Sequence, residues 1–370
     1  MKILVTGGAG FIGSHLVDAL VGRGHDVTIY DNLDPQVHPG GRSPQHLNPG
    51  AEFVRGDVLD EEALKSAVEK AEIIFHKASA VGVGQSQYQI AHYVRANTAG
   101  TATLLDILVN TKHNVRKLIV AASMSSYGEG LYECTECGPC RPPLRSAEQM
   151  AEGDWEPRCP CCGVSASPIP TPEEAALQCN SIYAITKKDQ EEMCLLIGKT
   201  YGIPVVSLRY FNVYGPRQSL SNPYTGVAAI FMSRIKNDRP PVIYEDGLQT
   251  RDFVSVEDVV QANLLAMERD EADGQIFNVG TGTPMTIRGV AEILAKAYGK
   301  PIRPDVTNKF RKGDVRHCYA DNTKLKNLLG FSPKFSFEEG IQELIAWSQT
   351  AEAVDHFEEA RAELEAKGLA

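Results

Sequence analysis

Short apolar runs alternate with amphipathic stretches along most of the chain. KILVT (2–6) and HDVTIYD (25–31) contain β-branched residues, and each predicts a strand. Between them, SHLVDALVGRG (14–24) places Leu16 and Ala19 at the spacing of one helix face. The beginning of the chain therefore predicts a strand, a glycine-rich turn, a helix and a second strand.

The same alternation continues downstream and indicates the fold class. Further strands are predicted over 52–58, 72–79, 115–128 and 203–210, and helices over 181–192, 286–298 and 337–367. Strands that alternate with helices are typical of a parallel sheet covered on both faces. We therefore expect an α/β fold with a Rossmann-like, doubly wound parallel sheet.

Composition narrows the class of protein. With 370 residues, 43% of them hydrophobic, the chain can bury the core of one large domain or of two that share a core. Its net charge of −10 repels phosphate backbones, so no nucleic-acid partner is expected. The N-terminus has no signal-like leader, and no apolar run approaches the ~20 residues that span a bilayer. We expect a soluble cytoplasmic protein, with no membrane partner and with reduced thiols.

Three glycines in the first turn, Gly7, Gly10 and Gly13, follow the pattern G-x-x-G-x-x-G. The first allows a tight turn, the second lets a pyrophosphate approach the helix N-terminus, and the third lets the helix pack closely on the sheet. Glycines alone also occur in ordinary turns, but here a strand and a helix flank them in the right order. This arrangement predicts a dinucleotide site.

Acidic residues stand at the ends of the next two predicted strands. Asp31 can accept from the adenosine ribose hydroxyls and would repel a 2′-phosphate, which favours NAD over NADP as the cofactor. The alternative is that Asp31 only begins the turn DNLD. Asp57 lies at the end of the strand over 52–58, where it is placed to reach the adenine.

The predicted helix over 181–192 carries Tyr183 and Lys187 on one face, a turn apart. A tyrosine pKa of roughly 10 must fall by roughly 3 units, about 4 kcal/mol, before the phenol acts as a base near neutrality. One ammonium at ~4 Å supplies about that much at an effective dielectric constant near 20. An isolated pair of this kind is usually a tyrosine packed beside a surface lysine. Here it follows a dinucleotide pattern and a serine-rich strand end, so we interpret it as catalytic.

Several longer motifs together resemble one known family. They are GGAGFIG (7–13), YAITK (183–187), RYFNVYGPRQ (209–218), NPYTGV (222–227), TRDFVSVEDV (250–259) and RKGDVRH (311–317). As a set they resemble the extended short-chain dehydrogenase/reductases, specifically the NAD-dependent nucleotide-sugar epimerases and dehydratases, over nearly all of the chain outside 129–172. In that family a Ser or Thr four residues before the tyrosine of a YG pair is catalytic. Here it is Ser123, whose hydroxyl would hydrogen-bond the oxygen on the carbon that is oxidised.

The resemblance also implies which residues hold the ligands. For NAD they are Gly7, Gly10, Phe11, Ile12, Gly13, Asp31, Asn32, Asp57, Val58, Ala78, Asn97, Tyr183 and Lys187, with Asn97 near the nicotinamide. For a nucleotide-sugar substrate they are Ser123, Met124, Ser125, Asn212, Tyr244, Arg251, Arg311 and Asp314. Asn212 would contact the diphosphate, and the two arginines would pair with its phosphates. Asp314 would bind a ribose hydroxyl, and Tyr244 would stack on the base.

The residues after Ser123 bear on the reaction. A related 4,6-dehydratase would carry Asp-Glu there and a UDP-glucuronate decarboxylase a Glu, whereas Met124 and Ser125 cannot do such acid–base chemistry near pH 7. The resemblance then implies redox-neutral epimerisation. Tyr183 takes the C4 hydroxyl proton as hydride passes to NAD, the 4-keto sugar turns over, and hydride returns to its opposite face. A 4-keto-sugar reductase is an alternative, but such reductases usually use NADPH.

A finer resemblance concerns the sugar. LDPQVHPGG (33–41), VGVGQSQYQI (81–90) and the cysteine-rich segment are similar to the dTDP-L-rhamnose 4-epimerase subgroup, which makes dTDP-6-deoxy-L-talose. Met124 would give that pocket an apolar wall. UDP-glucose/UDP-galactose 4-epimerisation is the alternative. The intact set of Ser123, Tyr183 and Lys187 disfavours a different class, a cofactor-binding protein whose insert recruits a partner without turnover.

The segment over 129–172 is unlike the rest of the chain, because it holds six of the nine cysteines and too few aliphatic residues to build a core. Two C-x-x-C-G knuckles have the spacing of a four-cysteine zinc ribbon. Their cysteines are Cys134, Cys137, Cys159 and Cys162. Cys140 or Cys161 is an alternative ligand. We expect one structural zinc outside the catalytic pocket. Because the insert joins the segments of Ser123 and Tyr183, we also expect it to form a wall or lid over the sugar.

These interpretations give a domain organisation. We expect an NAD-binding domain over 1–211, interrupted by the 129–172 insert and completed by 253–277. The nucleotide-sugar lobe would comprise 212–252 and 278–350, followed by a C-terminal helix over 351–370. The resemblance further implies a homodimer through helices that include the one carrying Tyr183.

Overall fold

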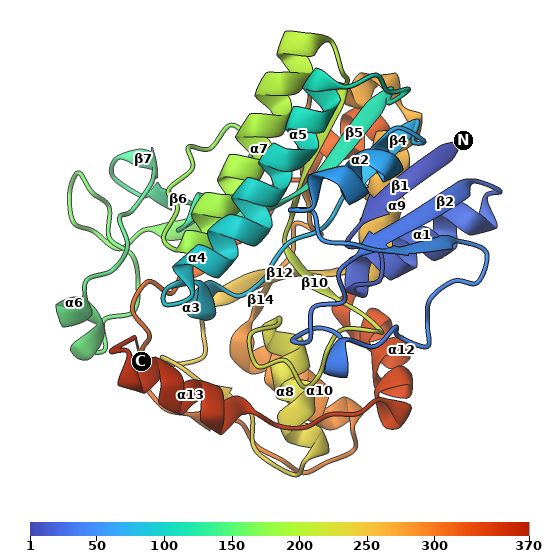
Figure 1. Ribbon diagram of the computed structural model, residues 1–370. Helices are drawn as coiled ribbons and strands as arrows, with labels where there is room; N and C mark the ends of the chain where they lie inside the picture. Colours follow the sequence, from blue (N-terminus) through green and yellow to red (C-terminus); the bar gives the residue numbers. More distant parts are fainter. Residues whose placement is uncertain (370) are drawn as a thin grey trace.

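A seven-stranded parallel sheet forms the centre of the protein in the computed structural model, which describes residues 1–369 (Figure 1). Its strands run in the order β13–β9–β5–β4–β1–β2–β3. They are β1 (Lys2–Thr6), β2 (Asp26–Asp31), β3 (Glu52–Arg55), β4 (Ile73–His76), β5 (Lys117–Ser123), β9 (Val205–Tyr210) and β13 (Ile276–Val279). The order reverses between β1 and β4, as in a doubly wound sheet, which confirms the predicted Rossmann-like α/β class.

Helices cover both faces of this sheet because its strands carry apolar side chains on both faces. Along β1, Ile3 and Val5 lie in one core and Leu4 lies in the other, as the alternation of a strand requires. The helices of the first core are α1 (Phe11–Gly22), α9 (Val256–Glu268) and α11 (Thr323–Leu329). Those of the second core are α2 (Glu61–Val68), α5 (Gly100–Asn110) and α7 (Ile182–Tyr201).

The strands β3, β4 and β5 end earlier than the sequence predicted. At the carboxyl edge of the sheet the chain leaves the ladder and forms loops. After β5 it forms a 3₁₀ turn, Met124–Tyr127, because the hydroxyl of Ser123 accepts from the backbone N–H of Ser125. The short helices α3 (Val83–Ser86) and α4 (Ile90–Tyr93) follow β4 and lead through a π-helical stretch, Val94–Ala99, into α5.

A smaller lobe packs below the carboxyl edge of the large sheet in Figure 1. Its strands are β10 (Asn212–Tyr214), β12 (Thr250–Ser255), β14 (Pro284–Thr286) and β16 (His317–Cys318), with a separate pair of β11 (Val242–Ile243) and β15 (Asp305–Val306). Its helices are α8 (Val227–Lys236), α10 (Ile287–Ala297) and α12 (Phe337–Thr350). Phe231, Leu294 and Phe337 belong to its core. β12 leads directly into α9, so the chain crosses from this lobe back to the large sheet.

The C-terminal segment is not one helix, although the sequence predicted helix over 337–367. α12 is followed by an extended linker and then by α13 (Phe357–Ala366). The linker is held by its own contacts: the backbone N–H of Val354 donates to Ser221 Oγ, and Asp355 forms ion pairs with Arg234 and Arg239. These contacts fix an extended backbone where helical periodicity alone would continue the helix. The predicted helix over 351–370 is therefore limited to α13.

The insert forms a small lobe of its own at the left of Figure 1. β6 (Leu131–Cys134) pairs antiparallel with β7 (Gly138–Cys140) and β8 (Ser167–Ile169), and α6 (Ala147–Ala151) lies in the loop between β7 and β8. Among the described helices of the chain, none combines the length and the apolar character that crossing a bilayer requires.

Candidate active site

A cavity of about 1070 Å³ lies between the carboxyl edge of the large sheet and the smaller lobe. It lies where the strand order reverses, which is where open α/β sheets bind nucleotides. The sequence-predicted residues that line it are Gly7, Gly10, Phe11, Ile12, Gly13, Asp31, Asn32, Asp57, Val58, Ala78, Ser123, Met124, Ser125, Tyr183, Lys187, Asn212, Tyr244, Arg251, Arg311 and Asp314. The structure thus brings together residues from both ends of the chain.

Asn97 is placed differently from the sequence-based expectation. It is fully buried behind the cavity wall, where its side chain accepts from the backbone N–H of Ala80 at 2.7 Å and donates to Thr186 Oγ1 at 3.0 Å. Ala80 itself lines the cavity. In this structure Asn97 therefore holds a loop of the site in place from behind.

The glycine loop depends on two positions. Gly7 has a φ of +67°, which favours glycine, and a Cβ on it would lie 2.7 Å from the backbone nitrogen of Ala78. A Cβ on Gly13 would lie 2.2 Å from the carbonyl oxygen of Gly7. The third glycine is therefore required because the first turn of α1 packs on the glycine loop itself, a closer constraint than the predicted packing on the sheet.

Asp31 begins a turn and also lies at the cavity. Its Oδ1 accepts from the backbone N–H of Leu33, so it does begin a turn, and its Oδ2 accepts from the N–H of Ala9 in the glycine loop. Its carboxylate also lines the cavity. On the neighbouring strand end, Asp57 accepts from the side-chain amide of Asn32 at 2.9 Å. The two acids lie at the cavity, and each is held by its own hydrogen bonds.

Ser123 and Tyr183 meet from two different elements. Ser123 is the last residue of β5, and Tyr183 lies in the first turn of α7, where its backbone N–H donates to Ser86 Oγ at 3.0 Å. Ser125 donates to Ser123 Oγ twice, through its backbone N–H at 3.1 Å and its hydroxyl at 2.9 Å. Because Ser123 accepts both of these bonds, its own proton is free to face the phenol of Tyr183, and the Ser123 hydroxyl lowers the pKa of that phenol.

The electrostatics of this pair differ from the simple expectation. Burial raises the pKa of Tyr183, and the hydrogen bond from Ser123 lowers it. Burial also lowers the pKa of Lys187 to about 7, and its Nζ donates to Gln190 Oε1 at 2.7 Å. The expected lowering of the pKa of Tyr183 by Lys187 is not among the effects that act on Tyr183 in the protein by itself, where desolvation is the largest effect on both groups.

A buried hydrogen-bonded chain, which was not identified from the sequence, holds Lys187. Gln190 Nε2 donates to Thr101 Oγ1 at 2.8 Å, and His76 Nε2 lies 2.9 Å from the same oxygen. Burial, followed by the charges of Lys187 and Lys77, lowers the pKa of His76 to about 3, so its ring is neutral at pH 7. The one available signal was the place of Gln190 on the same helix face as Lys187.

The opposite end of the cavity presents an aromatic ring and cationic groups. The guanidinium of Arg311 lies 4.7 Å from the ring centre of Tyr244, and its Nε donates to Asp314 at 2.8 Å. Arg251 is held by the backbone carbonyls of Thr250 and Arg316. These groups have the chemistry of a site for a base, a ribose and phosphates.

Asn212 carries a further sign of a ligand at this end. Its buried Oδ1 has no hydrogen-bond partner among the described residues, although Asn212 lines the cavity. An unpaired buried amide oxygen costs stability unless a ligand or a water bonds it. Its position fits a polar ligand in the cavity.

The C-terminal side of the cavity is lined by residues that were not identified from the sequence. Arg361 and Leu364 of α13 line it, and Tyr224 donates to Glu363 of the same helix at 2.8 Å. The apolar spacing of α13 indicated an amphipathic helix. Its position over the cavity depends on the extended linker before it, which the sequence did not reveal.

The insert does not form a wall or lid. No residue over 129–172 lines the cavity in the part of the chain that the structure describes, so this expectation is wrong. The insert begins after the 3₁₀ turn that ends at Tyr127, and it extends sideways from the sheet. Its polar side chains bond outside the cavity: Arg141, for example, donates to the carbonyls of Tyr127 and Glu129.

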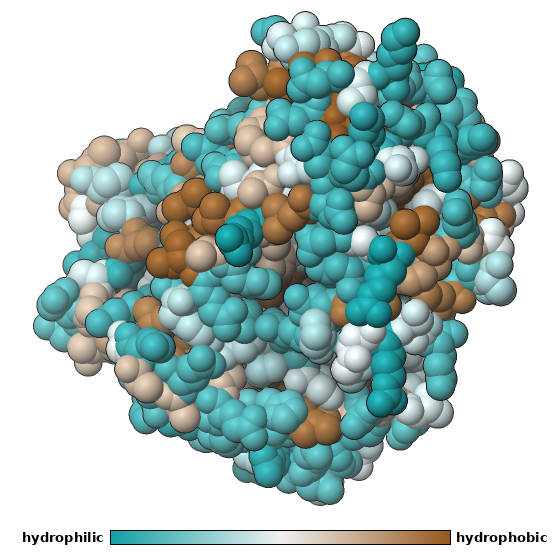
Figure 2. Space-filling model, in the orientation of Figure 1, coloured by the Kyte–Doolittle hydropathy of each residue, from teal (hydrophilic) through white to brown (hydrophobic). Residues whose placement is uncertain are grey.

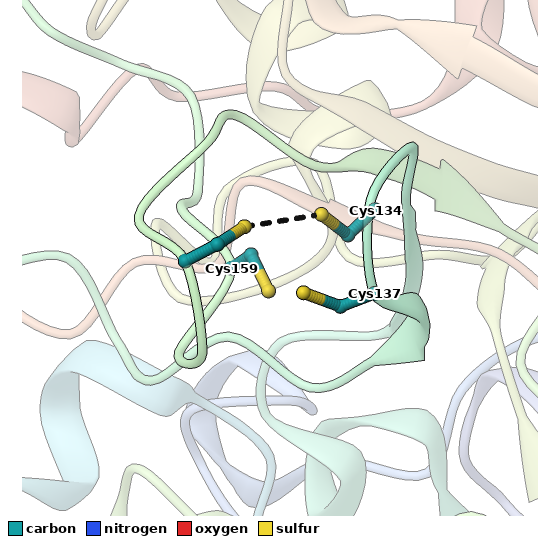
Figure 3. Close-up of side chains that lie close together, drawn as sticks. Cys134, Cys137 and Cys159 are labelled. Atoms are coloured by element: carbon teal, nitrogen blue, oxygen red, sulfur yellow. Dashed lines mark hydrogen bonds between the residues drawn. The ribbon is translucent and has the colours of Figure 1, made fainter.

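Within the insert, the two knuckles meet. The sulfurs of Cys134, Cys137, Cys159 and Cys162 all lie within 4.8 Å of one another, and those of Cys134 and Cys162 are 3.5 Å apart. Figure 3 shows the labelled sulfurs pointing toward a common centre from two separate loops. Cys140 and Cys161 are not members of this group.

The donor set fits a metal. Backbone N–H groups of Cys162 and Cys161 lower the pKa of the Cys159 thiol to about 6, which favours the thiolate that binds metals. A hydrogen bond with Cys162, followed by burial, raises the pKa of Cys137. Four sulfurs this close cannot all be anionic unless a cation lies between them.

The chain is similar to known proteins over nearly its whole length. The NAD dependent epimerase/dehydratase family matches residues 3–147, and GDP-mannose 4,6 dehydratase matches residues 164–344. The dTDP-L-rhamnose 4-epimerase of Burkholderia thailandensis is 36% identical, over 94% of this chain and 94% of the relative. The UDP-glucose 4-epimerase of Mycolicibacterium smegmatis is 32% identical, over 93% of this chain and 97% of the relative.

Solved structures agree with these similarities. A UDP-glucose 4-epimerase from Thermotoga maritima, solved with UDP-glucose, is 34% identical with a TM-score of 0.77, over 94% of this chain and 99% of that chain. A UDP-glucuronic acid 4-epimerase from Bacillus cereus, in complex with UDP-glucuronic acid and NAD, is 28% identical with a TM-score of 0.76, over 94% of this chain and 99% of that chain.

Proposed function

Because the chain belongs to the NAD-dependent epimerase/dehydratase family, we propose that it inverts C4 of a nucleotide-diphosphate sugar through a transient 4-keto intermediate. The observation that carries this proposal is that Ser123 and Tyr183 meet at the cavity wall, where Met124 and Ser125 follow Ser123. The pair provides the groups for oxidation at C4. The two residues after Ser123 provide no carboxyl group for a dehydration or a decarboxylation.

The glycine loop, Asp31, Asn32 and Asp57 fit NAD as the cofactor. The N-terminus of α1 offers backbone N–H groups for a pyrophosphate, and the hydrogen-bonded acids at the next two strand ends offer acceptors for ribose and adenine. When bound, NAD supplies the acceptor for the C4 hydride and, as the oxidised nicotinamide, a positive charge. We also assign Phe11, Ile12, Val58 and Ala78 to this half of the cavity.

The residues of the chain handle the proton and the orientation. Tyr183 accepts the proton of the C4 hydroxyl, and Ser123 donates a hydrogen bond that favours the phenolate. Lys187, fixed by Gln190, adds a cationic group one helical turn away. After the keto sugar turns over, Tyr183 returns the proton to the C4 oxygen. Bound NAD would supply the hydride to the opposite face of C4 and so would not be consumed.

We consider two candidate substrates, and we propose dTDP-L-rhamnose, a dTDP-sugar, as the preferred one. The Burkholderia thailandensis relative carries that activity in its name, and Met124 offers an apolar contact for the methyl group of a 6-deoxy sugar. UDP-glucose is the second, since the Thermotoga maritima structure was solved with that ligand. In both cases Tyr244 and Arg311 would hold the base and phosphates, with Asn212, Arg251 and Asp314 beside them.

The test is turnover of both sugars by the purified protein without added NAD(H). We expect the C4 epimer of dTDP-L-rhamnose and no steady change in absorbance at 340 nm, the band of the reduced cofactor. Turnover of UDP-glucose alone would keep the chemistry and refute the dTDP-sugar assignment. A reaction that stops after one turnover until NADPH is added would instead identify a reductase.

We propose that Cys134, Cys137, Cys159 and Cys162 hold one structural zinc ion. A tetrahedron with Zn–S bonds of ~2.3 Å places its sulfurs ~3.8 Å apart, close to the spacing that the four residues already have. Four thiolates leave no position for substrate, and the cavity lining includes none of the four cysteines. The metal therefore orders the insert and takes no part in the reaction at C4.

We further propose a homodimer through the face of α4 and α7. Ile90, Val94, Ile185 and Leu196 are exposed there, and Ile185 and Leu196 lie about three turns apart on one side of α7. Figure 2 shows hydrophobic side chains gathered over the region of α3, α4 and the beginning of α7. A second copy would cover this patch. Light scattering of the wild type beside Leu196→Glu tests this: a monomeric wild type contradicts it.

A further inference from the structure

A buried cluster of ion pairs joins the insert to two segments of the cavity wall. The side chain of Arg145, in the insert, is only 1% exposed. Its guanidinium bonds both oxygens of Glu245, each at 2.9 Å, and also donates to the backbone carbonyl of Asp314 at 3.0 Å. One insert side chain thus ties the chain after β11 to the chain before β16.

A second arginine lies at the centre of the same cluster. The fully buried guanidinium of Arg316 donates to Glu156 of the insert at 2.6 Å, to Asp246 at 2.7 Å and to Glu245 at 2.8 Å. Glu156 also lies 3.1 Å from His317 Nε2. With Glu129, which lies 3.8 Å from Arg145 Nε, the insert therefore contributes one cation and two anions to a network whose other members belong to the cavity wall.

The network is adjacent to the groups assigned to the nucleotide. Glu245 directly follows Tyr244, and both line the cavity. Asp314, whose carbonyl Arg145 bonds, pairs through its side chain with Arg311, and Arg311 stacks on Tyr244. A displacement of either segment would change the distance between the ring and the guanidinium.

The cysteine cluster fixes the part of the insert that enters the network. Arg145 and Glu156 both lie between Cys137 and Cys159, so joining the two knuckles closes the loop that carries them. Near the start of the insert, Glu129 accepts from the backbone N–H of Arg316 at 2.8 Å. The insert is thus attached to the cavity wall at its base and at its far loop.

Ion pairs of this kind specify geometry more than they add stability. An apolar cluster of similar volume is often as stable, whereas removing one partner leaves a buried charge unpaired at a cost of about 3–5 kcal/mol. Since no residue over 129–172 lines the cavity, among those the structure describes, the insert can affect a substrate only through the residues that it holds.

We propose that Arg145 and Glu156 are positioning residues for the nucleotide half of the substrate, an inference that rests on the proposed function. Through Glu245, Arg316 and the Asp314 carbonyl they hold the ring of Tyr244 and the guanidinium of Arg311 at the separation that receives a base and a diphosphate. The cysteine-rich insert is then an external brace of the nucleotide site. It acts on nucleotide affinity and not on the chemistry at Ser123 and Tyr183.

The test is Arg145→Met, which keeps an unbranched apolar stem and removes the charge and the donors. The matched control is Arg158→Met, because Arg158 is an exposed arginine of the same insert that pairs only with Asp154 among the residues described. Calorimetry with UDP and with dTDP gives nucleotide affinity without turnover. For Arg145→Met we expect Kd and KM to rise about tenfold or more, kcat to stay within about twofold, and NAD content to be unchanged.

The control and a conservative variant complete the design. Arg158→Met should bind nucleotide like the wild type, and Arg145→Lys, which keeps the charge but loses the bidentate contact, should fall between the two. Nucleotide affinity of Arg145→Met equal to that of the wild type overturns the proposal. So does a parallel loss of kcat, NAD and nucleotide binding, which would indicate a purely structural role.

Two outcomes keep this proposal separate from the proposed function. If Arg145→Met fails to fold, the Kd of Arg145→Lys decides, and a value equal to that of the wild type overturns the proposal. A wild type that binds UDP or dTDP but epimerises no sugar would refute the function, while the comparison of Arg145 variants would still decide the role of the insert.

Discussion

Replacing Ser125 by alanine should shift the pH dependence of turnover and leave its maximum nearly unchanged. Ser125 donates to Ser123 Oγ through its hydroxyl at 2.9 Å and through its backbone N–H at 3.1 Å. These two contacts direct the Ser123 proton to Tyr183, and that hydrogen bond lowers the pKa of Tyr183. Alanine removes the hydroxyl contact and keeps the backbone one.

The size and sign of the shift follow from this contact. A neutral hydrogen bond contributes about 0.5–1.5 kcal/mol, and one pKa unit corresponds to about 1.4 kcal/mol. The loss should therefore raise the pKa of Tyr183 by about 0.4 to 1 unit. Because Tyr183 acts as a base, activity on the acid side should fall by about two- to tenfold, while the plateau at high pH stays the same.

The assay is kcat against pH for the wild type, Ser125→Ala and Ser126→Ala. Ser126 lies in the same 3₁₀ turn, but its hydroxyl donates to the carbonyl of Ala184 at 3.3 Å and not to Ser123. The Ser126 variant should keep the acid limb of the wild type. An unmoved limb in Ser125→Ala, or a shift to lower pH, would refute the reasoning. An equal shift in both variants would point to a loosened turn.

Three further predictions concern the base, the cofactor and the metal. Tyr183→Phe should lower turnover by about 10²–10⁴-fold with NAD and nucleotide-sugar binding retained, as fluorescence titration can check; loss of the cofactor would mark a structural residue. Asp31→Ala should weaken NAD and relax the discrimination against NADP, and an unchanged ratio of the two Kd values would place the ribose contact elsewhere. The double variant Cys134→Ser/Cys159→Ser should lose one zinc per chain by metal analysis, and should lose nucleotide affinity and local protease resistance before NAD. A wild type without zinc contradicts the metal site.

Local patterns predicted the parts of the site that depend on local backbone. The glycine loop could be identified because a positive φ at Gly7 and the close approach at Gly13 restrict the residue type in the sequence itself. Tyr183 and Lys187 share a helix face wherever α7 packs, so their spacing was sufficient to predict that the two side chains lie together. The cysteine knuckles were likewise informative, since the C-x-x-C spacing brings the two sulfurs of each knuckle close together, and the structure brings the two knuckles together.

Features that depend on long-range packing could not be predicted. The pKa of Tyr183 is dominated by burial, which a sequence does not state, and Asn97 is buried behind the cavity wall, where it bonds Ala80 and Thr186. The insert joins Ser123 to Tyr183 along the chain, which suggested a lid. Its contacts instead lead to Glu245, a hundred residues after Arg145.

The most direct measurement of the central claim uses a nucleotide sugar labelled with deuterium at C4. The purified protein is incubated with labelled dTDP-L-rhamnose, and with labelled UDP-glucose in parallel, in ordinary water without added NAD(H). If C4 is oxidised and reduced again on one tightly held cofactor, the epimeric product keeps its deuterium at C4. Loss of the label to water with inversion at C4 would contradict the account, and so would the absence of any C4 epimer from either sugar.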